Sequence, residues 1–259
     1  MAQTLDTMEV RRQRWRDHMM GTAERQELKR QLYARYIVHR TDIHPEILGL
    51  IQRDIPRTFP RQPWVCQHAD TITRLLVQYA AVHRGDGYLQ GFNFAMAIMW
   101  RVFEGQPHAE ADTWWCFARY VGLVRPCIPD FNVTWYHSCR RRFLGELLYR
   151  LRRKRPVLHS ILVPTAEHFS TVVTCKWLLI WFAQQVSFED IFVLWDLLVE
   201  THPTKLFQCY TLILYQVFMA AAPDLTYQWS KNPTAFMGPL LGLKIQNVSE
   251  LVAAVRNAL

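Results

Sequence analysis

The chain has 259 residues, a formal net charge of +8 and 50% hydrophobic residues, among them 10 Trp, 10 Tyr and 14 Phe. This much apolar and aromatic surface excludes a disordered chain, and the length fits one domain or two. The six cysteines form no C-x-x-C pair, which argues against a zinc ribbon or a redox motif and favours a reducing compartment. Residues 1–10 lack the apolar core of a signal peptide, so we expect a cytoplasmic protein.

Apolar residues recur with helical spacing along the chain, and no run alternates long enough to predict a sheet, so the expected fold class is all-α. The spacing predicts amphipathic helices at residues 72–83, with a stop at Gly85, and at residues 90–103. Ser187–Asp190 has the pattern of a capping box before a buried helix. Further helices are predicted at residues 23–38, 43–54, 109–122, 134–153, 169–184, 205–221 and 248–257.

Proline-containing breaks separate these helices at Pro60–Pro63, Pro126–Pro129 and Pro156–Pro164. No Gly/Ser linker or repeat marks a domain boundary, and the best place for a break between two lobes is near residues 124–134. The most apolar run, Leu206–Ala222, lies at the lower end of the length that a membrane span needs. Because polar residues interrupt it, we interpret it as a buried core helix.

Positive charge is concentrated in residues 140–155, which contain eight Lys or Arg and a single acid, Glu146. Such a segment suits a nucleic acid or an anionic membrane. The alternative is a solvated helix face, in which Arg142 and Arg150 each lie four residues from Glu146. We expect the solvated face, with at most a weak contact to an anionic membrane and no nucleic-acid partner.

Common catalytic motifs are missing from the sequence, namely the P-loop G-x-x-x-x-G-K-[ST], H-E-x-x-H and G-x-S-x-G. The ten histidines show no ligand spacing, so no metal site is expected.

Two short stretches stand out. In the first, Asp54 stands three residues before Arg57, and Pro56 stops the helix so that Arg57 leaves it on a rigid turn. In the second, Tyr88–Gly91 presents the amide of Gln90 at the start of the next helix. Taken alone, Asp-x-x-Arg is usually a solvated ion pair worth about 0.2–0.5 kcal/mol.

Together these stretches resemble the motifs of the TBC-domain family, the GTPase-activating proteins for Rab GTPases. The first family motif, I-x-x-D-x-x-R followed by T-F-P, matches Ile51, Asp54, Arg57, Thr58, Phe59 and Pro60. The second, Y-x-Q-G with a following Asn, matches Tyr88, Gln90, Gly91 and Asn93. The third, a basic-Trp helix and a later W-D, matches Lys176, Trp177, Trp195 and Asp196.

The resemblance extends from about Trp15 to Leu259, because Trp15 and Gly21 are similar to the family's opening W-x-x-L-L-G and Asn232–Thr234 to its closing segment. The family's usual G-I-P…R opening is missing. We therefore expect residues 1–14 to be a divergent or truncated lead-in and residues 15–259 to be the domain.

The resemblance implies a two-lobed helical domain that supplies two side chains in trans to a GTP-bound Rab GTPase. Arg57 would be the arginine finger, oriented by Asp54, and Gln90 would be the glutamine finger that orients the attacking water. Supporting or partner-binding roles are implied for Ile51, Thr58, Phe59, Tyr88, Gly91 and Asn93. Trp195 and Asp196 are expected to hold the core together.

By the same resemblance, GTP and Mg²⁺ belong to the partner, so the chain itself needs no cofactor and is an activator without its own bound substrate. Such activators act in vesicle trafficking, in the cytoplasm or peripherally on organelle membranes. The alternative is a catalytically silent scaffold of the same fold that binds a small GTPase or another protein. Both fingers are present in this sequence, which argues against the scaffold.

Overall fold

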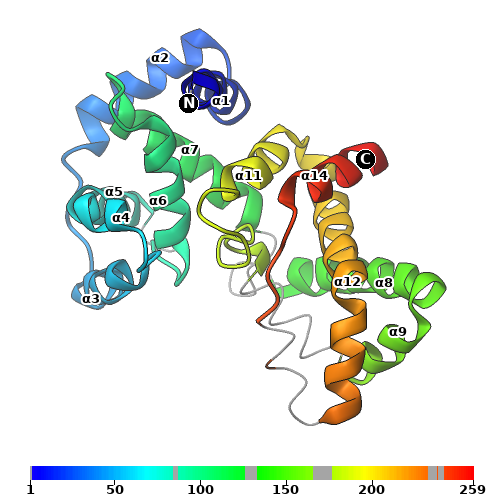
Figure 1. The fold of residues 1–259 in the computed structure, drawn as a ribbon. Helices are drawn as coiled ribbons and strands as arrows, with labels where there is room; N and C mark the ends of the chain where they lie inside the picture. Colours follow the sequence, from blue (N-terminus) through cyan, green and yellow to red (C-terminus); the bar gives the residue numbers. More distant parts are fainter. Residues whose placement is uncertain (1, 84–86, 126–132, 166–176, 233–237, 239–241) are drawn as a thin grey trace. The chain divides into compact units, whose positions relative to one another are not determined.

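The computed structural model describes residues 2–83, 87–125, 133–165, 177–232, 238 and 242–259. Within these ranges the regular elements are all helical and none is a β-strand, which confirms the all-α class (Figure 1). The chain divides into two compact units, Met1–Leu123 and Val124–Leu259. This division lies at the start of residues 124–134, the range in which the sequence predicts a break between two lobes.

The first unit is built from α-helices joined by short π- and 3-10 turns. They are α1 (Ala2–Met20), α2 (Ala23–Leu32), η1 (Tyr33–Ile37), α3 (Pro45–Asp54), η2 (Ile55–Arg57), α4 (Pro63–Gln67), α5 (Ala69–Val82), α6 (Phe92–Phe103) and α7 (Ala109–Val124). The periodicity does not predict α1 or α4. The short helix α4 forms because Pro63 occupies its first turn, where the missing N–H costs nothing.

Helix α6 is the core of the first unit, since every side chain along it except that of Arg101 is buried. Tyr79 of α5 meets the rings of Phe92 and Phe117 edge-on, at centroid distances of 6.3 and 4.8 Å. These aromatic contacts fix the amino-terminal end of α6 against α5 and α7. Trp15, in the family-like opening, is also fully buried.

A buried ion cluster ties the first two helices to α7. The carboxylate of Asp112 is fully buried and accepts hydrogen bonds from Arg16 and Arg30, each at 2.8 Å. The bond to Asp112 also raises the pKa of Arg30. A buried carboxylate needs such partners, because an unpaired charge in the core is strongly destabilising.

The second unit contains the long helices of the chain. Its described elements are α8 (Val133–Lys154), α9 (Pro156–Leu162), η4 (Val163–Thr165), α11 (Ile191–Glu200), η6 (Pro203–Lys205), α12 (Leu206–Lys231) and α14 (Val248–Ala258). Helix α12 packs against α8, α9 and α14, and α11 packs against α14. Pro203–Lys231 is long and apolar enough to cross a membrane, but 56% of its most apolar window is buried within the protein. That packing is what the sequence predicted for a core helix.

The helix predicted at residues 169–184 is wrong over its described part. Residues 177–184 form a π-turn followed by other turns, and Trp181 and Phe182 adopt left-handed φ values of 46° and 60°. Aromatic packing overrides the helical pattern here. The indole N–H of Trp181 donates to the hydroxyl of Tyr210 at 2.7 Å, and that of Trp195 donates to the Trp181 carbonyl at 3.0 Å. Residues 169–176 lie outside the described residues.

Other boundaries also differ from the sequence prediction. The expected break at Pro156–Pro164 contains α9, because Pro156 is accommodated in the first turn of a helix. Helix α12 continues through Pro223 to Lys231, beyond its predicted end. The Gly85 stop, Pro126–Pro129, Lys176 and Pro233–Thr234 fall outside the described residues.

The predicted capping box before α11 forms only in part, because the Ser187 hydroxyl accepts a backbone N–H but the Asp190 carboxylate accepts none from a described residue. The Ser187 hydroxyl accepts the Asp190 N–H at 3.1 Å and donates to the Asp190 carboxylate at 2.8 Å. The helix then starts at Ile191. Trp195 and Asp196 are buried, with 0% and 9% of their surfaces exposed, in agreement with the expected role in the core.

Candidate functional site

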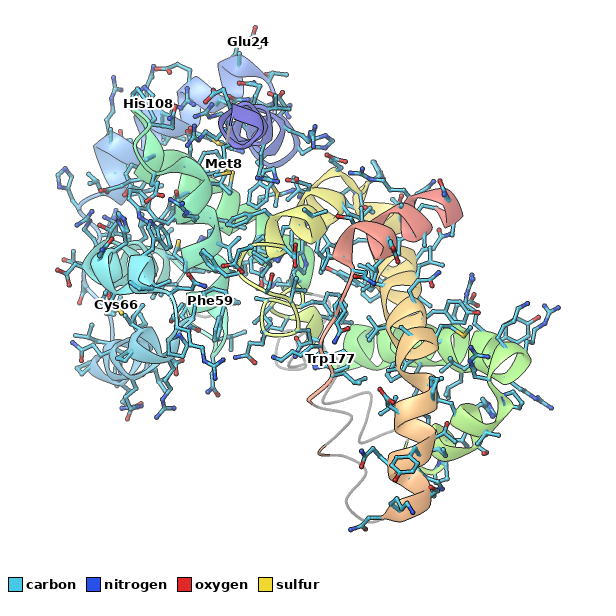
Figure 2. The ribbon with its side chains drawn as sticks, viewed as in Figure 1. Met8, Glu24, Phe59, Cys66, His108 and Trp177 are labelled. Atoms are coloured by element: carbon cyan, nitrogen blue, oxygen red, sulfur yellow. The ribbon has the colours of Figure 1, made fainter. Side chains whose placement is uncertain are left out.

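The first turn of the site, which we call the arginine turn, comprises residues 54–59 at the end of α3. Pro56 continues the chain as the 3-10 turn η2 instead of an α-helix, and Arg57 ends this turn on the surface. Phe59, labelled in Figure 2, takes a left-handed φ of 45°. Its ring meets that of Phe94 of α6 edge-on, with the ring centroids 5.0 Å apart. A residue with a Cβ adopts this conformation only when its surroundings hold it there. The Phe59 ring therefore anchors the arginine turn to α6.

The second turn, the glutamine turn, comprises residues 87–91 before α6. A side chain on Gly87 would come within 3.1 Å of the backbone of Ala80, so the turn lies directly against α5. Gly91 has a φ of 112°, which L-amino acids rarely adopt. The chain can therefore reverse here and present Gln90 at the surface immediately before the helix.

A buried hydrogen-bond network joins the two turns, and Asn93 is at its centre. The Asn93 side-chain N–H groups donate to the Thr58 hydroxyl at 2.7 Å and to the Asp54 carbonyl at 3.4 Å. Its side-chain oxygen accepts the Gly91 N–H at 3.1 Å. One amide thus contacts both turns. The Thr58 hydroxyl also donates to the Asp54 carbonyl at 3.0 Å, which closes the arginine turn on itself.

A second link joins Asp54 to Tyr88. The Tyr88 hydroxyl donates to the Asp54 carboxylate at 2.8 Å, and both side chains are buried. Burial, and then the hydrogen bond to Asp54, raise the pKa of Tyr88 far above its ordinary value. The phenol therefore stays protonated and keeps donating to the carboxylate. Ile51, on the same helix α3, is fully buried and packs in the core beside this network.

Asp54 and Arg57 do not form the ion pair suggested by their spacing. The Asp54 carboxylate is only 7% exposed and bonds to Tyr88, whereas the Arg57 side chain is exposed. Asp54 therefore helps to hold the backbone of the arginine turn, and this backbone positions Arg57.

Arg57 and Gln90, in contrast, are available to another molecule. Both side chains are exposed, and neither forms a hydrogen bond or an ion pair with any residue that the structure describes. The structure thus places the two exposed side chains of Arg57 and Gln90 over a largely buried base. This base is formed by other motif residues, namely Ile51, Asp54, Thr58, Phe59, Tyr88, Gly91 and Asn93. Motif spacing alone does not reveal that Asn93 is the bridge, because its partners lie 35 and 39 residues away. An Asn two residues after a glycine at a helix start is a local signal for one of its bonds.

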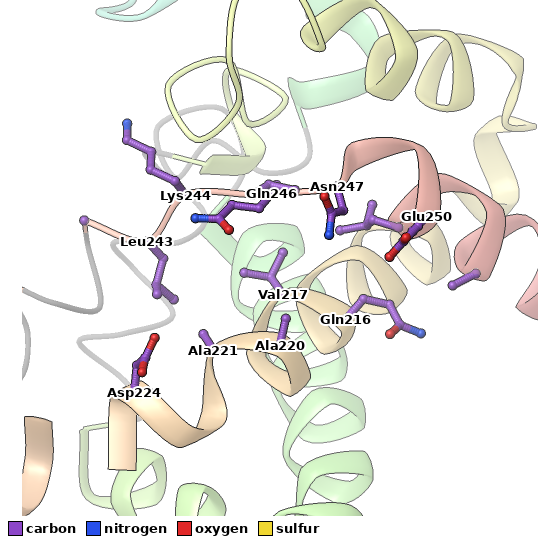
Figure 3. A pocket seen from close by; sticks show the side chains of 14 residues that line it. Gln216, Val217, Ala220, Ala221, Asp224, Leu243, Lys244, Gln246, Asn247 and Glu250 are labelled. Carbon is purple, nitrogen blue, oxygen red and sulfur yellow. The ribbon is translucent and has the colours of Figure 1, made fainter. Parts of the chain in front are cut away.

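Within the part of the chain that the structure describes, no three His, Cys, Asp or Glu side chains gather as metal ligands. A groove of about 660 Å³ lies in the second unit, between α12, residues 242–247 and α14 (Figure 3). None of the motif residues lines this groove. The candidate site is defined by the two turns, which carry the motif residues.

A family comparison identifies the class of protein. The family model of the Rab-GTPase-TBC domain matches residues 8–220, which is more than half of the chain. The chain belongs to this family, as the motif resemblance predicted. TBC domains in general are GTPase activators that act on Rab GTPases.

Individual relatives are distant. Human TBC1 domain family member 17 is 29% identical over 158 residues, which are 58% of this chain and 22% of that protein. Growth hormone-regulated TBC protein 6 of Caenorhabditis elegans is 26% identical over 65% of this chain and 49% of its own length. Growth hormone-regulated TBC protein 1 of Xenopus laevis is 25% identical over 74% of this chain and 57% of its own length. The chain thus spans well under two thirds of these relatives.

Proposed function

We propose that this chain accelerates GTP hydrolysis by a GTP-bound Rab GTPase, with Arg57 as the arginine finger and Gln90 as the glutamine finger. The observation that carries the proposal is the network around Asn93. It holds two turns from distant parts of the sequence side by side. The side chain displayed by each turn is exposed and makes no bond within the described protein.

The chemistry requires two contributions at neighbouring points. Charge spreads over the oxygens of the transferring phosphoryl group, and a planar guanidinium can donate to two of them at once. Arg57 supplies this group and is charged at any physiological pH. Gln90 has one donor and one acceptor group at its amide end, which suits it to hold the attacking water in line.

The rigid base below the two side chains serves the same chemistry. Interactions made in the transition state accelerate a reaction most when the groups are already in position. Asp54, Thr58, Tyr88 and Asn93 fix the backbone that carries the fingers without competing for their polar atoms. These four are positioning residues.

GTP and Mg²⁺ would be held by the partner, so the chain would contribute no metal or nucleotide site of its own. We further propose that the protein works in vesicle trafficking, in the cytoplasm or at the cytoplasmic surface of organelle membranes. The absence of C-x-x-C pairs among the six cysteines, which favours a reducing compartment, supports this location.

Single-turnover GTP hydrolysis by a panel of Rab proteins tests the proposal. At saturating activator, we expect at least one Rab to hydrolyse GTP orders of magnitude faster, and Arg57→Ala to remove about 10³-fold of that stimulation. Gln90→Ala should remove about 10²-fold. Arg53→Ala is the matched control, because Arg53 is also an exposed arginine and lies on α3.

Three outcomes would count against the proposal. If every Rab stays at its basal rate while the chain is folded, the scaffold alternative gains, and binding to GTP-loaded Rabs then becomes the discriminating measurement. If Arg57→Ala or Gln90→Ala keeps full stimulation, that residue is not a finger. If Arg53→Ala loses as much as Arg57→Ala, the effect belongs to general positive charge.

A further inference from the structure

The corner between α8 and α9 in the second unit combines unpaired positive charge with exposed apolar side chains. Arg152, Arg153 and Lys154 form the last turn of α8, and Arg155 precedes α9. All four side chains are exposed, and none forms an ion pair with a described residue. The nearby acid, Glu146, already pairs with Arg150 at 2.6 Å.

A solvated helix face accounts for only part of this charge. The Glu146–Arg150 pair forms as the spacing predicted, but it leaves the four cations of the corner without a carboxylate from any described residue. They are adjacent in sequence, and the sharp turn into α9 at Pro156 keeps them together at one end of the helix pair. Concentrated like charges repel one another, so a polyanionic surface that neutralises them would bind favourably.

Exposed apolar side chains lie beside the cations and indicate what kind of polyanionic partner the corner would bind. Val157, two residues after Arg155 in the first turn of α9, is 56% exposed, although α9 has a buried apolar face of its own. Tyr149, one turn before the cations, is 58% exposed, and the Arg153 guanidinium lies over its ring at 6.0 Å. Exposed aliphatic groups next to Lys and Arg are typical of segments that lie in the interface of a membrane.

We propose that this α8–α9 corner, formed by Tyr149, Arg152–Arg155 and Val157, binds the surface of an anionic lipid bilayer. The cations would face lipid phosphate and carboxylate groups, while the ring of Tyr149 and the side chain of Val157 enter the boundary between headgroups and acyl chains. Nucleic acid fits less well, because an exposed valine contributes nothing to contacts with a phosphate backbone. This surface is distinct from the finger residues.

The test compares binding of the full chain to phosphatidylcholine vesicles with and without phosphatidylserine, over a salt series. We expect binding only to the anionic vesicles and weakening as salt increases. Each Lys or Arg near such a surface contributes about five-fold. The triple variant Arg152→Gln, Arg153→Gln, Lys154→Gln should therefore bind about a hundredfold more weakly.

The matched control is Arg25→Gln, Arg35→Gln, Arg40→Gln, which removes the same charge from exposed positions of the first unit. We expect only the small loss caused by the lower net charge. Val157→Leu adds one methylene group at the corner and should strengthen vesicle binding about two- to four-fold. Because partly unfolded protein exposes apolar surface and also binds vesicles, urea unfolding must show that Val157→Leu is as stable as wild type.

The proposal is overturned if the wild-type chain does not bind anionic vesicles, or if the control triple loses as much binding as the corner triple. It is also overturned if Val157→Leu leaves vesicle binding unchanged while duplex DNA binds more tightly than the vesicles, because the corner would then be a nucleic-acid surface. Stimulation of a soluble Rab should be the same for wild type and the corner triple. The two proposals can therefore fail separately.

Discussion

The candidate site has an exposed upper level and a buried lower level, which differ in solvent exposure and in hydrogen bonding. Arg57 and Gln90 are exposed and make no bond within the described protein, whereas Asp54, Thr58, Tyr88 and Asn93 are buried and bonded to one another. Substitutions in the upper level should therefore change activity without changing stability. Substitutions in the lower level should change both, because a buried polar group that loses its partner is costly.

The largest effect expected is on the rate after Arg57→Lys. Lysine keeps the charge but cannot donate to two phosphate oxygens from a planar fork. We expect stimulation of the Rab to fall by about a hundredfold or more, with a free energy of unfolding within about 0.5 kcal/mol of wild type. Single-turnover hydrolysis and urea unfolding measure the two quantities. Full activity of the lysine variant would mean that charge alone suffices, and a lower stability would show that Arg57 has structural partners.

The next effect tests the lower level through Asn93→Ala. This change leaves the Gly91 N–H without its acceptor and removes one partner each from the Thr58 hydroxyl and the Asp54 carbonyl. We expect a loss of about 2–3 kcal/mol in the free energy of unfolding, together with lower stimulation at temperatures where the variant remains folded. Asn257→Ala, an exposed position on α14, is the control and should change stability by less than about 0.5 kcal/mol.

If Asn93→Ala lowers stability but leaves the stimulation of the folded protein unchanged, the network does not position the fingers. The difference between the two levels would then concern stability only.

The two levels also differ in how far the sequence predicts them. Motif spacing singles out Arg57 and Gln90, and helical periodicity places them at the ends of helices near residues 54 and 90. The partner of Asp54 is not predictable in this way: three-residue spacing suggests Arg57, but the fold brings Tyr88 to the carboxylate. A contact over 34 residues depends on tertiary packing, which local patterns do not contain.

The same reason explains the failed prediction at residues 177–184. The apolar pattern there is helical, yet the segment forms turns because Trp181 bonds with Tyr210 and Trp195 elsewhere in the core. Long, strongly periodic segments such as α5, α6 and α12 were in contrast predictable, since one face of each must be buried. Two prolines that stand in a predicted break or beyond a predicted helix end are instead part of helices: Pro156 begins α9, and Pro223 lies within α12.

A smaller effect is expected from Gly91→Ala, at the border between the two levels. Because Gly91 has a φ of 112°, a side chain there strains the turn that displays Gln90. We expect a loss of about 1–3 kcal/mol in the free energy of unfolding, and a loss of most of the stimulation that depends on Gln90. Adding Gln90→Ala to this variant should then have little further effect on the rate.

Gly145→Ala on α8 is the control of opposite sign. Gly145 lies within a helix, and a Cβ added to it would meet no atom within 4 Å, so alanine should stabilise the protein by about 0.4–1 kcal/mol. If Gly91→Ala is as harmless as Gly145→Ala, the glutamine turn is not constrained by its backbone conformation.

The smallest effect is confined to alkaline pH and concerns Tyr88 in the lower level. Its pKa is raised in the folded protein by burial and by the bond to Asp54, so above about pH 10 the unfolded chain has lost a proton that the folded chain keeps. The contribution of Tyr88 to stability is then fully present below the unfolded pKa and declines as the pH rises. Tyr88→Phe should reduce the slope of that decline by up to about 1.4 kcal/mol per pH unit at the alkaline end of the range. Urea unfolding from pH 8 to pH 11 measures the slopes, and equal slopes for wild type and Tyr88→Phe would mean that the Tyr88 hydroxyl is not held in the buried network.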